Sequence, residues 1–245
     1  MCEHIVKSFD EEIAALNTRL AQMGGLAEEQ LAGAIDALEK RDVERASEII
    51  KRDQKLDDLE HQVEERSILL IAKRQPMARD LRHVVVGLRT AMDLERIGDL
   101  AKNIAKRSFA ISDGRPTSGY SGINQMGRLA LEQLKLVLDA LVQHDADKAM
   151  EVWRSDEAID SLYNALFREL LTYMMEDPRT IGSCTHLLFA AKNIERIGDH
   201  CTNIAENVYY LVHGQTLNDD RPKSDTTSMT NIRYAGNGNK TSVDQ

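Results

Sequence analysis

The chain is built from two copies of one module, and this repetition constrains its fold more than any other feature. The segment at 23–59 aligns with the segment at 126–162 at a constant offset of 103, and sixteen of the 37 positions are identical. Further along, the string ERIGD at 95–99 recurs at 195–199, an offset of 100. A long internal repeat of this kind indicates two equivalent structural units. Each unit is about a hundred residues, a common domain size.

Each module has the pattern of three helices. The chain has only 4% aromatic residues and four prolines, a composition that favours helices over strands. Apolar residues recur at helical spacing, as in the series Ile49, Leu56, Val63 and Leu70. The pattern predicts an all-α fold, a tandem duplication of two three-helix bundles.

Helix boundaries can be read from caps and prolines. Asp42 and Asp145 stand where the periodic pattern breaks, which suits N-caps of the middle helices. Pro76 and Pro178 are expected to end those helices, because the residue before a proline avoids the helical region. The first helix is expected to begin near Ile5.

These signals divide the chain into four segments. The first repeat spans 1–112 and the second spans 123–214, joined by a linker rich in glycine and serine at 113–122. The remaining segment, 215–245, is polar and aperiodic, and we expect it to be a disordered tail.

Composition argues against several classes of function. The net charge is -9, whereas nucleic-acid-binding proteins are usually basic. No run of about eighteen apolar residues exists, so membrane insertion is not expected. The start of the chain lacks an apolar signal region, and three widely spaced cysteines do not suggest a disulfide framework. We therefore expect a soluble, cytoplasmic protein.

Acidic side chains form rows on the middle and third helices of both repeats. Glu95 and Asp99, like Glu195 and Asp199, are four residues apart and share a helix face. The middle helices carry further acids beside their apolar stripes: Asp53, Asp57, Glu60, Asp156 and Asp160. One interpretation is a solvated polar face. The other is that the rows converge between helices and bind a cation, because clustered carboxylates repel one another unless they are protonated or bridged.

The sequence shows no convincing catalytic machinery. It contains no serine–histidine–aspartate set, nucleophile elbow or dinucleotide-binding loop, and no organic cofactor is expected. A non-enzymatic protein is the main expectation, and a metal-dependent hydrolase that uses the carboxylates is the alternative. Gly98 and Gly198, both in mid-helix, suggest close approach of another backbone.

The duplicated ERIGD helices resemble the PhoU family. So do the segment RQP-M-x-x-DLR at 74–82 and TYMMEDPRT at 172–180, and the resemblance extends from about residue 5 to 214. It implies two tandem three-helix bundles, and it implies acidic E/D-x-x-x-D motifs that in some members bind multinuclear iron or zinc. Iron, zinc or manganese would then be held by Asp53, Asp57, Glu60, Glu95, Asp99, Asp156, Asp160, Glu195 and Asp199. Tyr163 stands where the first repeat has Glu60, which predicts fewer ions in the second repeat.

The resemblance also implies a function. Family members are regulators that repress the phosphate-starvation response. The implied partners are the ATPase of a phosphate ABC transporter, whose uptake the protein would modulate, and a phosphate-sensing histidine kinase. A homodimer located in the cytoplasm beside the inner membrane is expected on the same ground.

Overall fold

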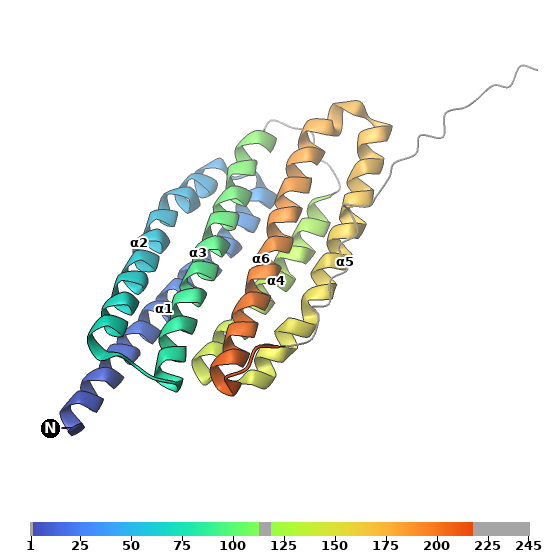
Figure 1. Ribbon diagram of the computed structural model, residues 1–245. Helices are drawn as coiled ribbons and strands as arrows, with labels where there is room; N and C mark the ends of the chain where they lie inside the picture. Colours follow the sequence, from blue (N-terminus) through green and yellow to red (C-terminus); the bar gives the residue numbers. More distant parts are fainter. Residues whose placement is uncertain (1, 113–118, 218–245) are drawn as a thin grey trace, which may run out of the picture.

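The computed structural model describes residues 2–112 and 119–217, and within them every regular element is helical (Figure 1). The all-α prediction and the duplication are confirmed. The elements are α1 (Cys2–Lys40), α2 (Val43–Arg74), α3 (Arg79–Ile111), α4 (Tyr120–Gln143), α5 (Ala146–Glu176), the short 3-10 helix η1 (Pro178–Thr180) and α6 (Ile181–His213).

The predicted caps position the middle helices. The Asp42 carboxylate accepts a hydrogen bond from the backbone N–H of Arg45 at 2.9 Å. In the second repeat, Asp145 accepts hydrogen bonds from the N–H groups of Asp147 and Lys148. Each cap satisfies donors that a helix N-terminus otherwise leaves unpaired. Both middle helices end two residues before a proline, as predicted.

Two predicted boundaries differ from the structure. The first helix already begins at Cys2, and α4 begins at Tyr120, inside the segment that was predicted as linker. Residues 113–118 of that linker and residues 218–245 of the predicted disordered tail lie outside the described residues. At the end of α6, Gly214 has φ 72°, the left-handed conformation that a glycine adopts readily at a helix C-terminus.

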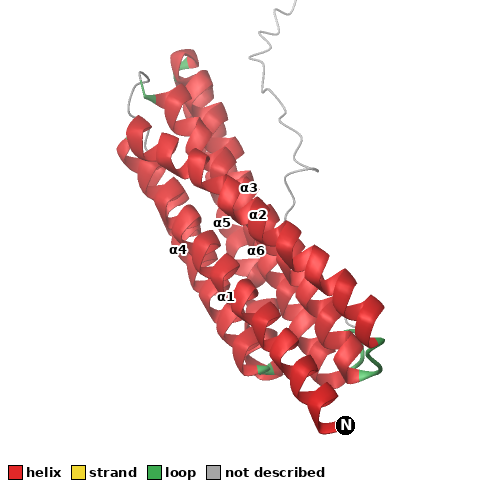
Figure 2. Ribbon diagram, turned by 90° about the vertical axis from the view of Figure 1, so that its left-hand side faces the viewer, coloured by secondary structure: helices red, strands yellow, loops and turns green. Residues whose placement is uncertain are grey.

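The two third helices lie side by side in the middle of the molecule (Figures 1 and 2). Helices α1 and α2 pack on α3, helices α4 and α5 pack on α6, and α1 also contacts α4. The apolar stripes fill both bundles, with Leu56 and Ile97 fully buried in the first and Ile197 and Ile204 in the second. Helix α3 therefore has neighbours on several sides, and so does α6.

Candidate functional site

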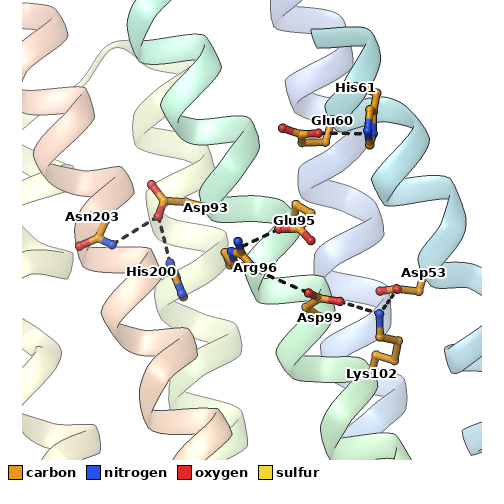
Figure 3. A network of polar contacts seen from close by, with 10 residues as sticks. All are labelled: Asp53, Glu60, His61, Asp93, Glu95, Arg96, Asp99, Lys102, His200 and Asn203. Atoms are coloured by element: carbon orange, nitrogen blue, oxygen red, sulfur yellow. Dashed lines mark hydrogen bonds and ion pairs between the residues drawn. The ribbon is translucent and has the colours of Figure 1, made fainter. Parts of the chain in front are cut away.

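The first acidic cluster lies between α2 and α3. Asp53 of α2 and Asp99 of α3 both contact the ammonium group of Lys102, which lies between them (Figure 3). Asp53 is only 5% exposed, and a buried carboxylate requires a countercharge. Lys102 supplies that charge from one turn further along α3.

The electrostatics of this cluster show an excess of negative charge. Burial and the charge of Asp53 raise the pKa of Asp57. Burial and the charge of Asp99 likewise raise the pKa of Glu95. Burial acts to lower the pKa of Lys102, but hydrogen bonds to Asp53 and Asp99 outweigh it and raise that pKa. One ammonium group therefore offsets only part of the charge of the converging carboxylates.

A cavity of about 370 Å³ lies between α2 and α3. Three predicted ligand residues line it, namely Asp57, Glu60 and Glu95. Arg96 also lines it, and its guanidinium lies 3.5 Å from Glu95 and 3.9 Å from Asp99. The acids of the first repeat thus converge from two helices, and cationic side chains accompany them.

The second acidic cluster is more deeply buried. Asp156, Asp160 and Glu195 are each at most 6% exposed, and Asp199 is half-buried. The Lys192 ammonium donates to Glu195 at 2.9 Å and lies 5.0 Å from the centre of the Tyr163 ring. Burial raises the pKa of Glu195, while the bond from Lys192 acts in the opposite direction.

The two repeats supply the ammonium group from different positions. At the offset of 100 that relates the ERIGD strings, Lys102 corresponds to Thr202, whose hydroxyl donates to Asp156 at 3.3 Å. Lys192 corresponds to Met92, which carries no charge. Each acidic cluster therefore has an ammonium group as countercharge, but from a different position: Lys102 follows Asp99 by three residues, and Lys192 precedes Glu195 by three.

The acidic rows are not a fully solvated face, because Asp53, Asp156, Asp160 and Glu195 are buried and the other predicted acids are partly buried. The solvated-face interpretation assumed that the side of a third helix opposite its apolar stripe faces water. The acidic rows instead lie toward the middle helix of the same repeat, where Asp53 and Asp57 of α2 approach Asp99, and Asp160 of α5 approaches Glu195. Glu195 is only 6% exposed there.

The mid-helix glycines also have a different neighbour from the one predicted. A Cβ atom at Gly98 would collide with the Leu56 side chain and lie 2.8 Å from Gln30 Oε1. A Cβ atom at Gly198 would lie 3.1 Å from Ile159 Cδ1. In both cases the space is taken by side chains of adjacent helices and not by another backbone. The glycines admit close packing of the first two helices of each repeat against the third.

The described conformation does not present a ready metal site. Within residues 2–112 and 119–217, no three histidine, cysteine, aspartate or glutamate side chains are grouped so that they could share one ion. In the first repeat, the Lys102 ammonium takes the place between Asp53 and Asp99 that a cation would need. Metal binding by the nine predicted residues stays a prediction, and it requires the lysines to move.

Sequence reasoning missed the lysines and a polar contact between the repeats. Lys102 follows Asp99 by three residues and Lys192 precedes Glu195 by three, so helical spacing could have indicated both pairs. No comparable signal marks Asp93 of α3, which contacts His200 of α6 (Figure 3). That contact depends on how the two repeats pack.

Two duplicated three-helix units with an acidic cluster in each define a class of tandem helical-bundle proteins. The PhoU domain model matches residues 20–108 and again 123–208. The chain belongs to the PhoU family.

Individual relatives are similar over nearly the whole chain. The phosphate-specific transport system accessory protein PhoU homolog of Caulobacter vibrioides is 51% identical over 94% of this chain and 100% of its own length. The protein of the same name from Rhizobium meliloti is 52% identical over 92% of this chain and 95% of its own. The crystal structure of PhoU from Pseudomonas aeruginosa covers 84% of this chain and 100% of its own, with 38% identity and a TM-score of 0.83. A role associated with phosphate transport follows from these relationships. Among the described residues, no helix combines the length and apolarity needed to cross a bilayer.

Proposed function

We propose that this protein is a non-enzymatic negative regulator of the phosphate-starvation response. It acts as a cytoplasmic adaptor that contacts two partners. One is the ATPase of a phosphate ABC transporter, whose uptake it modulates, and the other is a phosphate-sensing histidine kinase. The match of both repeats to PhoU domains, in relatives named as phosphate transport accessory proteins, carries the proposal.

The shape of the molecule suits an adaptor. The elongated helices of each repeat present long outer faces, while the two third helices hold the repeats together (Figure 1). Two related but unequal repeats offer two related but unequal surfaces, as an adaptor for two partners requires. We propose that the protein works as a homodimer, as expected for the family.

Gene deletion tests the regulatory proposal. Expression of a phosphate-regulated reporter in high phosphate is expected to rise when the gene is deleted and to return to its repressed level on complementation. A reporter that stays repressed in the deletion strain contradicts the proposal. Phosphate uptake, measured in the same strains, tests the link to the transporter separately.

We propose metal binding as a separate property of the acidic clusters. Iron, zinc or manganese would be held by the predicted carboxylates once Lys102 and Lys192 turn away from them, because these hard or borderline cations accept oxygen ligands. Elemental analysis of protein purified without chelator or histidine tag is the test. A variant with Glu95→Gln, Asp99→Asn, Glu195→Gln and Asp199→Asn is the matched control, and equal metal content in the two proteins contradicts the proposal.

The hydrolase alternative rests on the same carboxylates. Hydrolysis would need an ion with an open coordination position for water, next to a group that can accept a proton. The raised pKa of Glu95 is the one observation in its favour, since a carboxyl group with a raised pKa is a better base. Turnover of phosphate esters or nucleotides by metal-loaded protein, lost in Glu95→Gln, would support it, and no turnover retires it.

A further inference from the structure

A basic cavity lies between the ends of the two repeats, apart from the acidic clusters. Its volume is about 360 Å³, and it is enclosed by the first turns of α3, the end of α4 and the end of α6. It is about three helical turns from Glu95 along α3. The lining residues are Arg79, Arg82, His83, His144, Leu211 and Val212.

The cations of this cavity lack acidic partners. No carboxylate is among the lining residues, and among the described residues no ion pair joins Arg79 or Arg82 to an acid. The Nε atom of Arg82 is buried and has no hydrogen-bond partner in the described part of the chain. Two arginines without a paired carboxylate at a partly enclosed space favour the binding of an anion.

Two histidines add to this arrangement. The His83 ring, on α3, meets the His144 ring, at the C-cap of α4, edge to face with 5.1 Å between centroids. Burial, the charge of His144 and the charge of Arg79 lower the pKa of His83, while a hydrogen bond with the Arg79 backbone and the charge of Asp80 act in the opposite direction. The cavity is thus short of negative charge, and an anion within it would relieve the repulsion among these groups.

The repeat comparison shows that the basic cavity is not a by-product of duplication. At the offset of 100, Arg82 and His83 correspond to Gly182 and Ser183, which carry no charge. Arg79 corresponds to Arg179, and that arginine is paired with Asp177 at 2.8 Å. The start of α6 therefore lacks these charges, and the cavity combines the start of α3 in the first repeat with the ends of α4 and α6 in the second.

We propose that this cavity binds a free phosphate ion between the two repeats. Guanidinium groups match the oxygens of phosphate in geometry and charge, and Arg79 and Arg82 are the residues that hold it. The cavity volume of about 360 Å³ leaves ample room for a phosphate ion. The inference rests on the proposed function and deepens it, because the regulator would itself respond to the ion whose supply it reports.

Calorimetric titration with inorganic phosphate tests the site. The wild-type protein is expected to bind phosphate saturably near neutral pH, and Arg82→Gln is expected to weaken binding by at least about tenfold, the loss of a charge-assisted hydrogen bond. Arg79→Gln changes an exposed residue, so its effect on binding is separable from an effect on folding. Arg179→Gln is the matched control, and it should bind phosphate like the wild type.

Each outcome decides the proposal. Loss of binding in both Arg79→Gln and Arg82→Gln, with helicity unchanged, supports it. Absence of saturable phosphate binding to the wild type overturns it, and so does phosphate binding by Arg79→Gln and Arg82→Gln that is as tight as that of the wild type. Tight binding of ADP without binding of inorganic phosphate also overturns it, because the site would then recognise a nucleotide. Because the titration uses purified protein, its failure leaves the reporter test of the regulatory function unaffected.

Discussion

Asp93 of α3 and His200 of α6 form a polar contact between the two repeats, with 2.9 Å between Oδ1 and Nδ1. Asn203 and Asn207, on the same face of α6, donate to the Asp93 carboxylate at 3.3 and 3.5 Å. The Asp93 side chain is 14% exposed, so water has little access to it. The contact therefore fixes the relative position of the two central helices.

Removal of this carboxylate should destabilise the whole molecule. Asp93→Ala leaves the amides and the imidazole of α6 without their shared acceptor, at a cost of about 1–3 kcal/mol in the free energy of unfolding. Urea denaturation followed by circular dichroism measures the change. Asp139→Ala, an exposed aspartate on α4, is the control and should shift the free energy by less than about 0.5 kcal/mol. Equal effects of the two substitutions contradict the prediction.

The fold was predictable because its signals are local or repeated. Apolar periodicity, the Asp42 and Asp145 caps and the prolines each act within a few residues, and the duplication shows that one solution is used twice. The candidate site was predictable only in part. The acidic positions follow from helical spacing, but the burial of Glu195 depends on packing against α5 and the contact of Asp93 on packing between the repeats, and neither leaves a short-range pattern.

The two mid-helix glycines should differ in their tolerance of a methyl group. Gly98→Ala pushes against Leu56 and Gln30, and overpacking of about 1–3 kcal/mol should outweigh the gain of about 1 kcal/mol in helix propensity and leave a net loss of stability. Gly198→Ala meets Ile159 at 3.1 Å, a milder contact, and gains about 1 kcal/mol of helix propensity. The second variant should therefore stay close to the wild type in urea denaturation. Similar losses of stability in the two variants would contradict the prediction, because they would show that the helices pack equally tightly around Gly98 and Gly198.

The Lys102 ammonium should compete with metal ions for the first acidic cluster. Lys102→Met leaves Asp53 and Asp99 without their shared cation, which should lower the free energy of unfolding by about 1–3 kcal/mol in the absence of metal. Added Mn²⁺ or Zn²⁺ should then raise the melting temperature of the variant more than that of the wild type, because an ion that binds only the folded state stabilises it. Lys106→Met, at an exposed position of α3, is the control. A variant whose melting temperature does not respond to metal contradicts the prediction.

His83 should make the protein less stable as the pH falls. Its pKa in the folded state is lowered by burial, by His144 and by Arg79 from an ordinary value of about 6.5. Below that pH the unfolded chain binds a proton that the folded chain resists, so the free energy of unfolding decreases with falling pH. His83→Gln should reduce the loss in melting temperature between pH about 7.5 and about 5.5, measured in phosphate-free buffer.

His61 provides a control of opposite sign. It is exposed, and a hydrogen bond with the backbone carbonyl of Asp57, together with the charge of Glu60, raises its pKa. Its contribution to stability is present at low pH and is lost as the pH rises through the folded-state pKa. His61→Gln should therefore slightly increase the loss in melting temperature on acidification. A smaller loss, as expected for His83→Gln, would contradict the raised pKa of His61.

The two repeats should unfold together. Trp153, the single tryptophan, lies in α5 of the second repeat, is 7% exposed and donates to Glu206 at 3.1 Å. Its fluorescence reports on the second repeat, whereas far-ultraviolet circular dichroism reports on all helices. Because α3 and α6 pack along each other and Asp93 joins them, neither repeat can open without exposing the other's core. The two probes should give coincident urea transitions.

In Asp93→Ala, where the contact between the repeats is weakened, the fluorescence and dichroism midpoints should move apart. Separate midpoints already in the wild type would show that the repeats fold independently.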